Sequence, residues 1–200
     1  MYEYIQGLVS DLTPSNVIIE VGGVGYLIQI SVTTYTACQA AANDAAKPFR
    51  VYIHQIIRED TNELFGFADK QERLMFRHLI SVSGIGANTA RTILSSLNTA
   101  DIQEAITSSN VNLLKSIKGI GLKTAQRIIV DLKDKVSKLH ADSEIFATND
   151  NTIKQEAFSA LVNLGFSKSD VEKALEKIIP KGTNQSITVE AVIKSALKSL

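Results

Sequence analysis

The pattern of apolar and polar positions changes near residue 69, from a strand-like to a helix-like period. Up to residue 67 the apolar residues form short runs or alternate with polar ones, and Val, Ile and Tyr are frequent, as in half-buried strands. Gly22-Gly23, between the second and third run, is a connection of the kind that forms a tight hairpin. The predicted strands cover residues 4–10, 17–21, 24–30, 49–57 and 63–67.

Five short strands predict a small closed barrel. The alanine-rich segment 36–46 follows the third strand, where a five-stranded oligonucleotide-binding barrel (OB-fold) carries a helix or a long loop. Cys38, the only cysteine, lies there and is expected to be a packing residue. A single cysteine forms no internal disulfide, no apolar run reaches the roughly 18 residues of a membrane span, and the start has no signal-peptide pattern. We therefore expect a soluble cytoplasmic protein without membrane contact.

The helical part of the chain contains one unit twice. Residues 79–90 return as residues 114–125, which places the Gly-Ile-Gly sequences 84–86 and 119–121 in register at an offset of 35 residues. Each unit is predicted to be a helix, a glycine turn and a second helix. The second helices are expected at residues 89–97 and 124–139.

A Gly-Ile-Gly turn has a physical use. Without Cβ atoms the turn is tight and its N–H groups can approach a phosphate, while the following helix directs its positive N-terminal end at the same oxygen. Such contacts bind backbone rather than sequence, so two copies can hold both strands of a duplex across the minor groove. A pair of helix caps without a ligand is the alternative interpretation. The candidate DNA-backbone residues are Gly84, Ile85, Gly86, Asn88, Thr89, Lys118, Gly119, Ile120, Gly121, Lys123, Thr124 and Arg127.

The charges are segregated along the chain, although 21 Lys plus Arg balance 21 Asp plus Glu and the net charge is zero. Residues 1–63 carry 3 basic and 7 acidic groups (net −4), residues 64–140 carry 11 and 6 (+5), and residues 141–200 carry 7 and 8 (−1). The basic surplus coincides with the glycine turns, where phosphates would lie. Lys133, Lys135 and Lys138 are interpreted as solvating a helix face.

Other chemistry is disfavoured by residue spacing. The second turn lacks the glycine before lysine of a Walker loop, and no dinucleotide fingerprint is present. His54, His78 and His140 lack Cys or carboxylate companions at ligand spacing. We therefore predict no catalytic residue, no metal and no cofactor. A structure-specific nuclease or glycosylase that grips DNA through hairpins is the enzyme alternative, and a non-catalytic interaction scaffold is the third class.

The end of the chain predicts a tethered module. Residues 140–151 are polar and aperiodic, which indicates a flexible linker. Ser167 with Asp170 forms a capping-box-like helix start. A small module without catalytic groups is typical of docking to a partner. Its helices are expected at residues 153–164, 168–178 and 189–200.

Further motifs accompany the two hairpins along the chain. They are the Arg58-Glu59-Asp60 turn, Leu64-Phe65-Gly66-Phe67, Gln71-Glu72-Arg73, and Ala160 to Phe166, which is similar to a turn of ubiquitin-associated (UBA-like) domains. This ordered set resembles the RuvA family, the Holliday-junction-binding subunits of the bacterial branch migration complex. The resemblance runs the length of the chain and implies a multidomain α+β fold. The implied domains are an OB-fold barrel with an acidic hairpin (1–63), a tandem helix-hairpin-helix domain (64–139), the linker (140–151) and a three-helix motor-docking domain (152–200).

The resemblance also implies a function. The chain would be a non-catalytic subunit that holds four-way junctions open and planar and couples them, through residues 152–200, to the RuvB ATPase. The process is branch migration in homologous recombination, DNA repair and the SOS response to DNA damage. A homotetramer is implied, with an octamer as the alternative, and the RuvC resolvase is a further candidate partner.

Two features of the family pattern concern individual side chains. Glu59 and Asp60 match its acidic pin, placed near the crossover of the junction. Asn88 and Leu122 depart from the pattern, because related sequences often have lysine at these positions. We therefore expect a weaker salt dependence of DNA binding than a lysine-rich relative shows.

Overall fold

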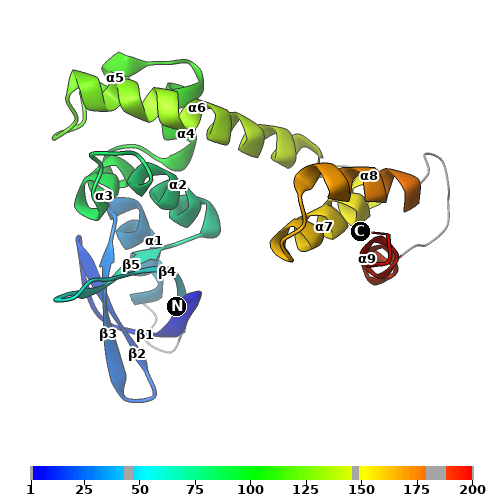
Figure 1. Cartoon of the computed structure of the whole chain (residues 1–200). Helices are drawn as coiled ribbons and strands as arrows, with labels where there is room; N and C mark the ends of the chain where they lie inside the picture. Colours follow the sequence, from blue (N-terminus) through cyan, green and yellow to red (C-terminus); the bar gives the residue numbers. More distant parts are fainter. Residues whose placement is uncertain (1, 43–46, 146–148, 179–187, 200) are drawn as a thin grey trace. The chain divides into compact units, whose positions relative to one another are not determined.

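The computed structural model describes residues 2–42, 47–145, 149–178 and 188–199, leaving aside the side chains of residues 137–152 and 155 (Figure 1). Two compact units, Met1–Ser137 and Lys138–Leu200, are described separately. A closed five-stranded barrel and the helices that bear the glycine turns form the first unit, and three helices form the second. The predicted α+β fold class is therefore confirmed. None of the described helices has the length and apolar character needed to cross a bilayer.

The barrel closes in the strand order β1-β2-β3-β5-β4, with β3 and β5 parallel and all other neighbours antiparallel. Gly22 and Gly23 form the predicted tight connection, with φ values of 58° and 83°. Cys38 is fully buried, and burial raises the pKa of its thiol to about 12, as expected for a packing residue. The elements are β1 (Tyr4–Thr13), β2 (Asn16–Val21), β3 (Val24–Ile30), α1 (Val32–Ala42), β4 (Phe49–Ile57) and β5 (Asn62–Phe67).

Several helix boundaries differ from the sequence-based expectation, and one helix was not predicted; the helices after the two glycine turns, for example, each begin two residues earlier than predicted. Helix α1 begins four residues before the predicted segment 36–46, whose residues 43–46 lie outside the described chain. A further helix, α4, starts where the Asn98 side chain accepts a hydrogen bond from the Asp101 N–H at 2.8 Å, a regular N-cap. The helices of this part are α2 (Lys70–Ile80), α3 (Ala87–Ser96), α4 (Thr99–Thr107), α5 (Val111–Lys115) and α6 (Leu122–Ile145).

A buried carboxyl group joins the barrel to the hairpin helices. Glu72, 2% exposed at the start of α2, accepts hydrogen bonds from the hydroxyls of Ser31 and Thr34 and from the Ala68 N–H. Burial raises the pKa of this carboxyl group above its usual 4.5. Because Ser31 and Thr34 lie at the start of α1, these hydrogen bonds hold α2 against the barrel.

Arg73 makes a second connection beside the first. Its guanidinium donates to the carbonyls of Glu3 and Ile53, at 2.8 and 3.3 Å, and forms an ion pair with the Glu3 carboxylate at 2.5 Å. Strand β5 also shares its apolar side chains with the helices, since Phe65 and Phe67 pack on Phe76 of α2 at ring distances of 5.3 and 4.8 Å. The predicted domain boundary between residues 63 and 64 falls within β5, whose phenylalanines pack on the helices, and that boundary stays a prediction from sequence.

Two histidines make the stability of this unit sensitive to acid. Nδ1 of His54 and Nε2 of His78 are buried without a hydrogen-bond partner, and burial lowers the pKa of both imidazoles below the usual 6.5. The unfolded chain therefore takes up protons first, and the unfolding free energy falls as the pH drops below 6.5. We expect urea denaturation at a series of pH values to show this loss. A variant with His54→Phe and His78→Leu should lose much of it, and an unchanged pH dependence would contradict the assignment.

The second unit is a three-helix module with its own core, formed by Leu161, Leu175 and Val192 among others. The predicted capping interaction is present, because the Asp170 N–H donates to Ser167 Oγ at 3.2 Å and that hydroxyl donates to Asp170 Oδ2 at 2.7 Å. In the last helix, Val192 and Ala196 are buried, while Leu200 lies outside the described residues. The helices are α7 (Asn149–Asn163), α8 (Lys168–Ile178) and α9 (Val189–Leu197).

The predicted linker at residues 140–151 contains helical segments, and its role as a flexible linker stays a prediction from sequence. Helix α6 continues to Ile145 and α7 begins at Asn149, so most of the segment is helical, while residues 146–148 lie outside the described chain. The physical reason is the absence of Gly and Pro from residue 122 to residue 164, because nothing else in that sequence stops a helix strongly.

Candidate nucleic-acid interface

The two glycine turns have the same backbone geometry. The first glycine of each, Gly84 or Gly119, has a φ of 92° or 90°, in the region where residues other than glycine are strained. The isoleucine that follows donates its N–H to a carbonyl three residues earlier, at 3.1 Å in the first turn and 3.0 Å in the second. The predicted repeat is therefore confirmed at the level of individual hydrogen bonds.

The second glycine of each turn is not required by the packing of the chain. A Cβ atom on Gly86 or Gly121 would meet nothing within 4 Å, and Gly86 has an ordinary φ of −86°. An alanine would therefore fit at either position within the free protein. What the missing Cβ provides is space outside the chain, through which another molecule can approach the backbone closely.

Helices α3 and α6 begin directly after these glycines. The first backbone bonds of the two helices run from Ala90 N to Gly86 O and from Ala125 N to Gly121 O, each at 2.9 Å. Gly86 is the N-cap of α3 and supplies no side-chain hydrogen bond. The N–H groups of residues 87–89 and 122–124 thus precede the first helical bond, at the positive end of the helix dipole. This arrangement suits a phosphate oxygen.

The predicted site residues divide into anchors and exposed groups. The side chains of Ile85 and Ile120 are each 5% exposed and lie in the core, so only their backbone faces a ligand. Thr89 and Thr124 are half-buried. The exposed members of the set are Gly84, Gly86, Asn88, Lys118, Gly119, Gly121, Lys123 and Arg127.

The positive charge is distributed unequally between the hairpins. Residues 78–90 of the first hairpin contain no Lys or Arg, whereas the second hairpin has exposed Lys115, Lys118 and Lys123. Arg127 belongs to the second hairpin by sequence, but its Nη1 donates to the carbonyl oxygen of Ser83 at 3.2 Å, next to the first turn. The structure therefore brings this predicted residue to the first hairpin as well.

Glu59 and Asp60 lie together in the loop between β4 and β5. The Arg58 N–H donates to the Thr61 carbonyl at 2.8 Å and closes this loop, and both carboxylates are exposed at its tip. Among the described residues, neither carboxylate forms a hydrogen bond or an ion pair with a hairpin. Two acidic groups are thus presented to solvent at one end of the barrel.

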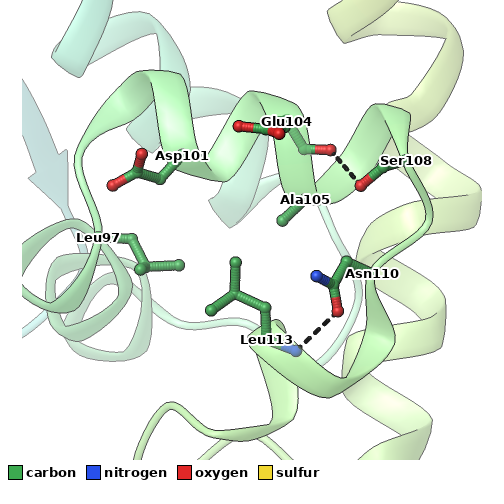
Figure 2. A pocket seen from close by; sticks show the side chains of 7 residues that line it. All are labelled: Leu97, Asp101, Glu104, Ala105, Ser108, Asn110 and Leu113. Carbon is green, nitrogen blue, oxygen red and sulfur yellow. Dashed lines mark hydrogen bonds between the residues drawn. The ribbon is translucent and has the colours of Figure 1, made fainter.

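A hollow of about 280 Å³ between α4 and α5 is distinct from both turns (Figure 2). Asp101 and Glu104 line it together with apolar Leu97 and Leu113, and the Asn110 side chain is engaged in accepting from the Leu113 N–H at 3.1 Å. Nowhere in the described chain do three or more His, Cys, Asp or Glu side chains gather in a way that could hold a metal ion.

Comparison with known proteins finds family models that match three successive segments of the chain. Three family models match: RuvA N terminal domain over residues 1–66, SAM-like helix-hairpin-helix tandem over 76–134, and RuvA C-terminal domain over 152–200. The Holliday junction branch migration complex subunit RuvA of Flavobacterium psychrophilum is 48% identical over 200 residues. The proteins of the same name from Azobacteroides pseudotrichonymphae and Bacteroides fragilis are 46% and 44% identical over 202 and 208 residues. In each case all of both chains is covered.

Proposed function

The chain belongs to the RuvA family, and on that premise we propose that it binds four-way DNA junctions in an open, planar form and couples them to a RuvB ATPase for branch migration. One observation carries the DNA-binding part. Two glycine turns in one unit lead directly into the N-termini of α3 and α6, with open space in front of their second glycines. A Cβ atom on either glycine would meet no neighbour within the chain, so there is room for a phosphate to approach the backbone N–H groups that follow.

Binding would proceed through the phosphates of one duplex arm per subunit. In each hairpin the backbone N–H groups after Gly86 or Gly121 donate to a phosphate oxygen, and the helix dipole adds to the attraction. Lys118 and Lys123 supply positive charge at the second turn. These contacts read no base, so the complex is independent of the sequence of the arm.

The side chain at position 88 determines how strongly salt weakens binding. Asn88→Lys adds one cation beside the first turn and should steepen the slope of log affinity against log salt concentration by about 0.9, since about one more counterion is released. Lys123→Gln should make the slope shallower by a similar amount. A salt titration of wild type and both variants on one junction measures this. Equal slopes for all three proteins would remove these side chains from the phosphate contact.

The acidic pair would discriminate against DNA that passes straight through the centre. A carboxylate about 4 Å from a phosphate costs about 1 to 4 kcal/mol, depending on the local dielectric. At an open junction the strands separate around the centre, so the repulsion is avoided and strand separation is favoured.

Neutralising the pin tests this role. Glu59→Gln with Asp60→Asn should raise the affinity for linear duplex while changing that for the junction little, so that the ratio of the two affinities falls about tenfold or more. Both substitutions keep the size of the side chain on an exposed loop, and the fold should be unaffected. If the ratio of junction affinity to duplex affinity did not change, Glu59 and Asp60 would have no role beyond forming the turn.

Assembly and partners complete the proposal. The chain acts as a non-catalytic subunit in the cytoplasm, as a tetramer that places four hairpin pairs around one junction, with an octamer on DNA as the larger form. Residues 152–200 dock the ATPase, and RuvC is a further partner. Recombination and repair of damaged DNA are the processes served.

The global shape of the bound junction tests the open planar form. Fluorescence energy transfer between labels on the arm ends should give equal efficiencies for all four neighbouring arm pairs when the full chain is bound. Two efficient and two inefficient neighbouring pairs would indicate a stacked junction and contradict the proposal.

A further inference from the structure

Arg127 connects the two hairpins. It lies on α6, which follows the second turn, yet its Nη1 is 3.2 Å from the carbonyl oxygen of Ser83, the residue before Gly84 in the first turn. Two helical turns further along α6, Lys135 Nζ donates to Ser81 Oγ at 3.2 Å. Ser81 is the C-cap of α2, so both cations lie at the negative end of that helix, where positive charge is favourable.

The internal repeat shows that only the second hairpin reaches across to the other one. The counterpart of Arg127, 35 residues earlier, is Thr92, and the counterpart of Ser83 is Lys118. The Thr92 hydroxyl donates to the Asn88 carbonyl of its own helix at 2.9 Å and does not cross to the second hairpin. The symmetry of the two units is thus broken at the residue that carries the charge.

The first hairpin lacks what Arg127 provides. Residues 78–90 contain no Lys or Arg, and Arg91, which follows them, donates from Nη1 to the Ser15 carbonyl of the barrel at 3.2 Å, while the matching residues 113–125 of the second hairpin contain three lysines. A guanidinium has five N–H donors, and the Ser83 carbonyl occupies one nitrogen, which leaves donors and the full charge for an anion beside the first turn.

We propose that Arg127 serves the first hairpin rather than its own: it sets the position of the first glycine turn against α6 and supplies the positive charge for the phosphate bound there. The second hairpin is complete without it, because Lys118 and Lys123 provide its charge. This inference rests on the proposed function of the hairpins as phosphate sites and assigns Arg127 to one of them.

A double-mutant cycle on the full chain tests the assignment. Gly86→Ala and Gly121→Ala block one phosphate site each without a clash in the chain, and Arg127→Met removes the charge and the donors at similar length. The measured quantity is affinity for one four-way junction. Arg127→Met should lower it about tenfold in the wild-type background and about tenfold in the Gly121→Ala background, but less than about twofold in the Gly86→Ala background.

Lys123→Met is the matched control on the same helix, and its effect should disappear in the Gly121→Ala background instead. Arg127→Lys, which keeps a charged donor, should restore most of the affinity. Melting temperatures identify variants that fail to fold. The assignment is overturned if Arg127→Met couples to Gly121, if it is additive with both glycine variants, or if it has no effect. The same cycle is repeated with linear duplex as the DNA. A failure of junction recognition would appear as a low ratio of junction affinity to duplex affinity, whereas the assignment of Arg127 is read from the coupling within each cycle.

Discussion

Replacing Gly86 and Gly121 together with alanine is expected to weaken junction binding at least about a hundredfold while leaving the melting temperature unchanged. Each added methyl group stands where a phosphate would approach the N–H groups of α3 or α6. Losing hydrogen bonds to a charged group costs about 1.5 to 3 kcal/mol at each site, and two sites together give about a hundredfold or more. Within the free chain neither Cβ has a neighbour within 4 Å, so the fold is not strained.

The first glycines of the turns provide the contrast. Gly84→Ala or Gly119→Ala places a side chain at a φ near +90°, and each should therefore lower the melting temperature. Junction titrations and thermal melts of all four single variants measure both effects. Normal junction affinity in the double variant at positions 86 and 121 would show that the turns are helix caps without a ligand.

Of the substitutions proposed for this protein, replacement of the Glu72 carboxyl group is expected to lower the free energy of unfolding the most. Glu72→Leu leaves the hydroxyls of Ser31 and Thr34 and the Ala68 N–H without their acceptor in a buried place, which should lower the unfolding free energy by about 2 to 4 kcal/mol. Glu72→Gln keeps one acceptor oxygen and the size of the side chain, and its loss should be less than half as large. Urea denaturation with constant m-values measures the difference.

Glu72→Leu also tests whether the connection between α2 and the barrel matters for DNA binding. The hydrogen bonds of Glu72 hold α2, and with it the first turn, against the barrel that carries the Glu59–Asp60 loop. Glu72→Leu should therefore lower the preference for junction over duplex even where the protein remains folded. A stability equal to that of the wild type would contradict the structural role of this carboxyl group.

Local sequence patterns are sufficient to predict the glycine turns, but they do not predict the contacts of Glu72 and Arg73 that connect α2 to the barrel. The glycine turns repeat in sequence and their geometry depends on positive φ at Gly84 and Gly119, which residue identity alone indicates. Glu72 and Arg73 were recognised only as part of a family motif, because their partners lie far away in sequence. Ser31 and Glu3 are 41 and 70 residues from them, a separation at which periodicity carries no signal.

The same limit applies to Arg127 and to the helix boundaries. In the sequence Arg127 follows Gly121 by six residues, which indicates the second turn, whereas tertiary packing brings it to Ser83, 44 residues away. Helix α4 was missed although its signal was present, since Asn98 with Asp101 is an N-cap pair. The helical parts of residues 140–151 were missed because a polar, aperiodic composition was given more weight than the absence of Gly and Pro.

Zero net charge is compatible with DNA binding here because the charges lie in different parts of the chain. The surplus of +5 falls on residues 64–140, which bear the hairpins, and part of the acidity of residues 1–63 lies in the loop that carries Glu59 and Asp60. An account based on the whole-chain charge would have missed both features.

Direct competition between two DNA substrates tests the central claim. The full chain is titrated, at one salt concentration, against a labelled four-way junction in the presence of unlabelled linear duplex of the same length and base composition. We predict that the junction is bound at least about a hundredfold more tightly and that no strand is cut when Mg²⁺ is added. Equal affinity for junction and duplex would contradict the account, and metal-dependent cleavage would contradict the non-catalytic role.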